Sequence, residues 1–280
     1  MTKEKIMLMI AMIMMITSCS DDEKTTDILP PSDNYVSTIT VRDKNSAETA
    51  PAKIKFLYDK QRRITRIEWG TAVPGRPEWN IIYGDGTIHF RHTGDSQSAE
   101  RYCIMGADST AYTMHYQDEQ NTAQASVQYS GGTMVTAQGT AEGGISASYD
   151  FAWTRGCMTG ISTVIRRDGR DSLALTSQLV YDDFLPNNTN IDYNIILNTL
   201  NAVPVRYFEA PMLLGFCGTK SARLMARHTF TAEYPGHPEK TVMTSFSVLR
   251  YSMDNGRITS IETLDDTSAR HLVLDITYKR

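Results

Sequence analysis

The chain has 280 residues, of which 41% are hydrophobic and 21% are charged, and its formal net charge is −4 at pH 7. This length fits one large or two small domains, and the apolar fraction is enough to build a core. The slightly acidic balance, without a cluster of basic residues, argues against nucleic acid as a partner.

The first 18 residues have the pattern of an export signal. Two lysines precede an apolar run over residues 6–16, which is shorter than the roughly 20 residues of a membrane-spanning helix. Thr17-Ser18-Cys19, after an isoleucine, resembles a bacterial lipobox, in which cleavage precedes the cysteine and its thiol takes a diacylglycerol. We predict a lipoprotein signal peptide over residues 1–18 and a lipid on Cys19. An ordinary signal peptide with an incidental cysteine is the alternative.

A run of polar and acidic residues follows the cysteine directly: Ser20, Asp21, Asp22 and Glu23. It resembles the surface-export signal of lipoproteins in the Bacteroidota, which implies lipid anchoring in the outer membrane and exposure on the cell surface. The start of a solvated tether would explain the same residues. Residues 19–38 are predicted to be an acidic, polar tether, and residues 39–280 a folded domain.

The domain is dominated by β-hairpin patterns. Ile54, Phe56 and Tyr58 alternate with polar residues, and a polar turn over residues 59–62 leads into an aliphatic strand. Near the end of the chain the pattern returns around Asn255-Gly256, which suits a type I′ turn because both central residues need positive φ. Weaker copies of the turn occur at Asp85-Gly86, Arg155-Gly156 and Asp168-Gly169.

A repeated hairpin cannot bury its apolar face alone, so the units are expected to stack into one sheet. We predict a mainly all-β fold: a large curved antiparallel sheet of repeated hairpins, with one short helix covering a face. Within residues 187–201, Ile191, Ile195 and Leu200 would line one side of that helix. Asn190 is predicted to cap its start.

Four stretches together resemble a Bacteroidota lipoprotein family, the domain of unknown function 4595. They are NIDYNIILN, LLGFCGTKSARL, YSMDNGRITSIE and the terminal LVLDITYKR, and the resemblance is most specific over residues 181–280. The hairpins are also similar to tyrosine-aspartate repeats, although the glycine of that turn is missing at Gln61-Arg62. The resemblance implies a lipoprotein but supplies neither an activity nor a site.

Three cysteines remain besides Cys19, and their odd number allows at most one disulfide within the monomer. We expect Cys103, Cys157 and Cys217 to be buried thiols, because cysteine behaves as a small apolar residue. No metal and no cofactor is predicted. On a strand, His89 and His92 would point to opposite faces of the sheet.

No convincing catalytic motif is present, so no catalytic residue is predicted. Trp79, after a loop rich in Pro and Gly, is expected to be the most exposed tryptophan and a possible ligand contact. The predicted function is a non-enzymatic, lipid-anchored surface protein that binds a glycan, a host ligand or an envelope partner. Two alternatives stay open: a periplasm-facing lipoprotein that shelters a lipid or other apolar ligand, and a hydrolase with an unrecognised site.

Overall fold

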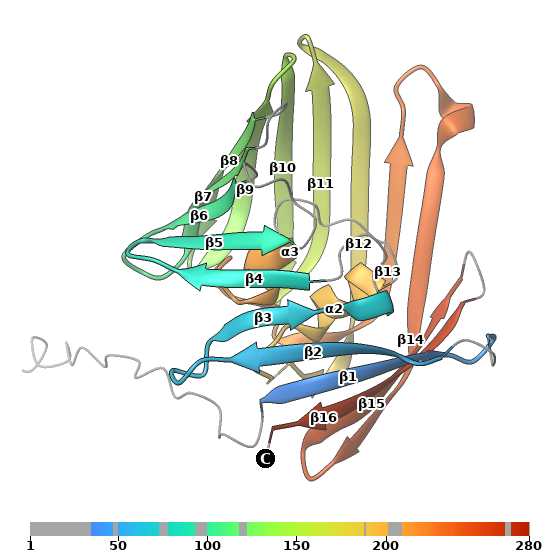
Figure 1. The fold of residues 1–280 in the computed structure, drawn as a ribbon. Coiled ribbons are helices and arrows are strands. Elements are labelled where there is room, and N and C mark those ends of the chain that lie inside the picture. The colour runs from blue at the N-terminus through green and yellow to red at the C-terminus, as the bar shows by residue number, and fades with distance from the viewer. Residues whose placement is uncertain are drawn as a thin grey trace, which may run out of the picture.

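The computed structural model describes residues 35–46, 50–72, 78–92, 100–117, 122–187, 189–200, 209–266 and 270–279. Within these residues, sixteen antiparallel strands follow one another in chain order and close into a barrel (Figure 1). The predicted all-β fold of repeated hairpins is confirmed. Closure comes from the first and last strands, which pair from Val36–Tyr278 to Asp43–Leu272.

The strands differ in length, so the wall of the barrel is taller on one side than on the other (Figure 1). The first eight are β1 (Val36–Asp43), β2 (Ala52–Tyr58), β3 (Ile64–Glu68), β4 (Glu78–Tyr83), β5 (Thr87–His92), β6 (Glu100–Met105), β7 (Ala111–Gln117) and β8 (Thr122–Ser130). The others are β9 (Thr133–Ala141), β10 (Ile145–Thr154), β11 (Cys157–Arg167), β12 (Arg170–Pro186), β13 (Arg223–Glu233), β14 (Val242–Asp254), β15 (Arg257–Asp265) and β16 (His271–Tyr278). Since β1 begins at Val36, the folded domain starts slightly before the predicted boundary at residue 39.

The predicted turns join neighbouring strands as expected. Asn255 and Gly256, between β14 and β15, have φ values of 48° and 77°, as a type I′ turn requires. Arg155-Gly156 and Asp168-Gly169 also have positive φ at both residues. The hairpin around residues 59–62 pairs β2 with β3. Local turn chemistry therefore fixes these connections.

The wall of the barrel is apolar inside and polar outside. In β2, Ile54 and Phe56 are buried whereas Lys53 and Lys55 are exposed. Because side chains of a strand alternate between faces, the same division recurs on other described strands. Single apolar side chains are also exposed, among them Ile82, Ile104, Val180, Phe184, Met243 and Leu249. Outward positions on β8 to β10 are held by small polar residues, among them Gln124, Ser126, Gln128, Thr136, Gln138, Thr140, Ser146, Ser148 and Asp150.

Two short helices connect β12 to β13 and lie inside the barrel, α2 (Tyr193–Leu200) and α3 (Glu209–Leu213) (Figure 1). All residues of α2 except Thr199 are buried, so this helix fills the interior. The predicted helix within residues 187–201 is therefore confirmed and covers the concave face of the sheet. Short 3-10 turns occupy Gly70–Ala72 and Pro238–Lys240. Among the described residues, no helix is long and apolar enough to cross a membrane.

The cap of α2 differs from the prediction. Asp192 caps the helix, because its Oδ1 accepts from the backbone N–H of Asn194 at 3.0 Å. Asn190 instead joins β1 to β2: its Oδ1 accepts from the Val36 N–H at 3.1 Å, and its Nδ2 donates to the Tyr58 hydroxyl at 2.8 Å. The prediction that Asn190 caps α2 is wrong, because this side chain is used for a tertiary contact.

Aromatic side chains tie the strand ends together at one rim of the barrel, the rim at which β1 begins, here called the tether rim. Near the end of an even-numbered strand, a Tyr hydroxyl or Trp N–H donates to a backbone carbonyl near the start of the preceding strand. In the described chain these bonds run from Tyr58 to Val36 (2.6 Å), Tyr83 to Ile64 (2.8 Å), Tyr129 to Ala111 (2.8 Å), Trp153 to Met134 (2.7 Å), Tyr181 to Met158 (2.7 Å), Tyr251 to Met225 (2.6 Å) and Tyr278 to Ile258 (2.9 Å). The hairpin repeat therefore carries a repeated bond as well as a repeated turn.

Candidate functional site

A row of three rings crosses the outer face of β5, β6 and β7. His89 pairs with Tyr102, and Tyr102 pairs with His115, so the three residues lie side by side. The ring centroids of Tyr102 and His115 are 4.7 Å apart with an interplanar angle of 12°, and those of His89 and Tyr102 are 5.3 Å apart. The neighbours Ile88, Cys103 and Met114 are buried, which places the three rings on the outside.

The surroundings of this aromatic row combine apolar and polar groups. Ile82 pairs with His89 and is 48% exposed, whereas Gln124 pairs with His115 at the other end. Thr113 and Ser126 form the next outward cross-strand pair. A sugar has C–H groups, which pack against aromatic rings, and hydroxyl groups, which form hydrogen bonds. The aromatic row beside amide and hydroxyl side chains offers partners for both kinds of group. Sequence reasoning weighed His89 only as a metal ligand, although the alternation Ile88-His89-Phe90 already placed it opposite the core.

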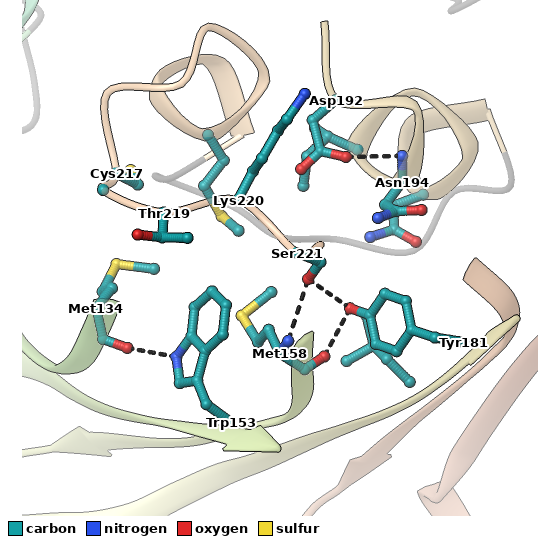
Figure 2. Close-up of a pocket in the computed structure, with 15 residues that line it drawn as sticks. Met134, Trp153, Met158, Tyr181, Asp192, Asn194, Cys217, Thr219, Lys220 and Ser221 are labelled. Carbon is teal, nitrogen blue, oxygen red and sulfur yellow. Dashed lines mark hydrogen bonds between the residues drawn. The ribbon is translucent and has the colours of Figure 1, made fainter. Parts of the chain in front are cut away.

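The interior holds a small cavity, lined by both polar and apolar side chains, between the wall and the segment that precedes β13 (Figure 2). Its volume of about 20 Å³ leaves room for roughly one water molecule. The cavity is lined by Met134, Trp153 and Met158 of the wall, by Asp192 and Asn194 at the start of α2, and by Cys217, Thr219, Lys220 and Ser221 (Figure 2). A space this small cannot hold a lipid or a sugar.

Asp192 and Lys220 form the charged part of the cavity wall. Burial raises the pKa of Asp192, while the charge of Lys220 and a bond from Asn187 Nδ2 at 3.0 Å oppose this shift. Burial also lowers the pKa of Lys220, whose Nζ donates to the Thr189 carbonyl at 2.5 Å. The Asp192 carboxylate and the Lys220 ammonium both form hydrogen bonds with other residues of the chain, which indicates a structural role.

Ser221 links this segment to the wall (Figure 2). Its Oγ accepts from the backbone N–H of Met158 at 3.1 Å and lies 2.9 Å from the Tyr181 hydroxyl. Burial raises the pKa of Tyr181, so the phenol stays protonated and continues to donate to the Met158 carbonyl. The interior network therefore fastens α2 and its flanks to the barrel.

The predicted contact residue Trp79 is only 1% exposed. Its ring packs edge to face on Trp69, with centroids 5.2 Å apart. The expectation that Trp79 is the most exposed tryptophan is wrong, because its place in β4 points it inward with Ile81. Trp79 is thus not available on the surface for a ligand.

The three cysteines of the domain are free and buried, as predicted. Burial raises the pKa of Cys103 to about 12 and that of Cys217 well above its usual value. Cys103 and Cys217 therefore stay protonated and unreactive. Cys19 and the acidic run Ser20, Asp21, Asp22 and Glu23 lie outside the described residues, and their roles stay predictions.

Two solved structures share this fold. A porin-like protein from Bacteroides vulgatus ATCC 8482 superposes with a TM-score of 0.62 at 13% identity, over 88% of this chain and 99% of that chain. A porin-like protein from Bacteroides uniformis ATCC 8492 gives a TM-score of 0.55 at 13% identity, over 87% and 98%. No protein-family model and no curated protein matches the sequence. At this identity the likeness shows a common barrel fold.

Proposed function

We propose that this chain is a non-enzymatic, lipid-anchored protein of the outer membrane, whose barrel stands in water on the cell surface and binds glycan. The lipid is carried by Cys19, the acidic run Ser20–Glu23 directs export, and the domain of unknown function 4595 is the proposed family. The observation that carries this proposal is the polarity of the wall. The porin-like fold of the similar structures agrees with an outer-membrane protein.

A barrel that spans a bilayer presents an apolar band to the lipid and polar residues to its interior. In this chain the described wall is apolar on its inner face and mainly polar on its outer face, although single apolar side chains such as Val180 and Leu249 are exposed. Its outer face carries ion pairs such as Arg42–Asp275 and Lys55–Glu68. Glu262 accepts hydrogen bonds from Lys44 and His271, which hold its pKa at about 2. Such a wall favours water, so attachment to the membrane is assigned to the lipid.

The filled interior weighs against the lipid-sheltering alternative. The helix α2 is buried inside the barrel at every residue except Thr199, and the cavity beside it has room for about one water molecule. Binding is therefore assigned to the outer surface. The aromatic row of His89, Tyr102 and His115 replaces Trp79 as the candidate contact for a glycan.

A glycan array with the purified domain tests this assignment. We expect a glycan that binds the wild type and binds the Tyr102→Ala variant roughly 30-fold more weakly, since a central aromatic contact contributes about 2 kcal/mol. Tyr234→Ala, which removes a partly exposed tyrosine beyond the end of β13, is the matched control and should bind as the wild type does. An array without any binder, or an equal loss in both variants, would contradict the proposal.

A further inference from the structure

The chain enters the barrel beside its own last strand and beside the β2–β3 turn. The backbone N–H of Lys279 donates to the Tyr35 carbonyl at 2.7 Å. The guanidinium of Arg62 lies 5.7 Å from the centre of the Tyr35 ring, and Tyr35 packs edge to face on Tyr58 at 5.5 Å. The start of β1, the end of β16 and this turn thus form one sector of the tether rim (Figure 1).

This sector carries an excess of positive charge. Lys60, Arg62 and Lys279 are exposed, and the Lys279 ammonium lies 5.6 Å from the centre of the Tyr58 ring. The other charges nearby come in pairs of opposite sign. Asp59 forms an ion pair with Arg63 at 2.8 Å, and Asp254 stands opposite Arg257 in the strand register. Three cations, here called the basic collar, therefore remain around the point where the tether begins.

In the residues that the structure describes, the rest of the barrel ends carry more acidic than basic side chains. Elsewhere on the tether rim, Arg155 in the β10–β11 turn is outnumbered by Asp85 and Asp108 in turns and by Asp182 and Asp183 near the end of β12. At the opposite rim, Lys44, Arg167, Arg170, Lys240 and Arg270 are outnumbered by Asp43, Glu142, Asp168, Asp171, Glu233, Glu239, Asp265 and Asp266 among the described residues. The charge of the molecule is thus arranged so that one sector, the one nearest the tether, is attracted to anions.

We infer that the basic collar of Lys60, Arg62 and Lys279 docks on the phosphates of lipid headgroups in the membrane to which the chain is tethered. The inference rests on the proposed lipid anchor. The stretch between Cys19 and Val36 spans at most about 60 Å when fully extended, so it holds the collar near the headgroups. Each cation at an anionic surface strengthens binding about fivefold.

The test uses the full mature chain, residues 19–280 with Cys19→Ser, and vesicles of phosphatidylcholine with or without phosphatidylglycerol. We expect co-sedimentation with the anionic vesicles at low ionic strength, and its loss in high salt, because salt screens such contacts. The triple variant Lys60→Gln, Arg62→Gln, Lys279→Gln should bind roughly 100-fold more weakly. The charge-matched control, Arg167→Gln, Arg170→Gln, Lys240→Gln at the opposite rim, should bind as the unsubstituted chain does.

Equal binding to both kinds of vesicle, no binding to anionic vesicles at low salt, or an equal loss in both triple variants would each overturn the inference. Thermal unfolding of both variants checks that the exposed substitutions leave the fold intact. Because the assay uses a chain without lipid, its failure leaves the lipid anchor unaffected. Conversely, an intact-mass measurement that finds no lipid on exported protein would refute the anchor and leave the vesicle result standing.

Discussion

His228 is the residue at which the interior of the barrel is most sensitive to acid. Its side chain is fully buried, and its Nδ1 lies 2.7 Å from Asn198 Oδ1 on α2. Because an amide oxygen only accepts, Nδ1 carries a proton and donates it to Asn198. Burial lowers the pKa of His228 to about 4, well below its value of about 6.5 in an unfolded chain.

This shift predicts a loss of stability in acid. As the pH falls below 6.5, His228 becomes protonated in unfolded chains but stays neutral in the native state. The unfolding free energy therefore decreases until the pH reaches about 4, where His228 is protonated in the native state as well. The full difference is about 3 kcal/mol. Denaturant unfolding of the wild type and of His228→Asn, measured at several pH values, should show a steeper decline for the wild type. Parallel curves would contradict the prediction.

Trp79 and Tyr102 show what the sequence offers at the scale of single residues. In the stretch Glu78-Trp79-Asn80-Ile81, strict alternation already places Trp79 with the apolar residues, but the neighbouring Pro/Gly-rich loop suggested exposure. The row around Tyr102 depends on cross-strand register. The alternation of apolar and polar residues within one strand can therefore be predicted from the sequence. Contacts between strands can be predicted only when the register of strand pairing is known.

At the scale of elements, the aromatic bonds at the tether rim explain why hairpins end in Tyr or Trp. The β5–β6 pair is the exception in the described chain, where β6 ends in Met105. The sequence predicts the hairpins and their Asn-Gly or Asp-Gly turns, because these depend on nearby residues. It does not reveal the acceptor of each hydroxyl, since Tyr251 bonds a carbonyl on the neighbouring strand at Met225.

These bonds should contribute measurably to stability. Tyr251→Phe keeps the ring but leaves the buried Met225 carbonyl without its donor, which is expected to lower the unfolding free energy by about 1–2 kcal/mol. Tyr234→Phe removes a hydroxyl from a partly exposed ring, and its effect should stay within about 0.5 kcal/mol. Chemical denaturation of the two variants provides the comparison. Equal effects would show that the hydroxyl bond is dispensable.

At the scale of the whole molecule, closure depends on the pairing of β1 with β16, the two ends of the domain. Alternation and turns specify which strands are neighbours along the chain, but they do not say whether the sheet curls until its edges meet. Closure then determines which part of the chain packs against the inner face of the sheet. The inner face encloses α2, and the outer face carries lysines, serines and glutamines.

The polar wall predicts that, once salt has removed the contacts of the basic collar, the lipid holds the protein on the membrane. Exchange of residues 1–19 for a signal peptide that is cleaved without lipidation should release the domain into the soluble envelope fraction, since the described wall carries ion pairs on its outer face, where a spanning barrel would carry an apolar band. Exchange of residues 1–18 for the signal of another lipoprotein keeps Cys19 and should leave the protein in the membrane fraction. Fractionation after a high-salt wash removes contacts that depend only on the basic collar. Retention of the unlipidated domain after that wash would mean that the wall itself enters the bilayer.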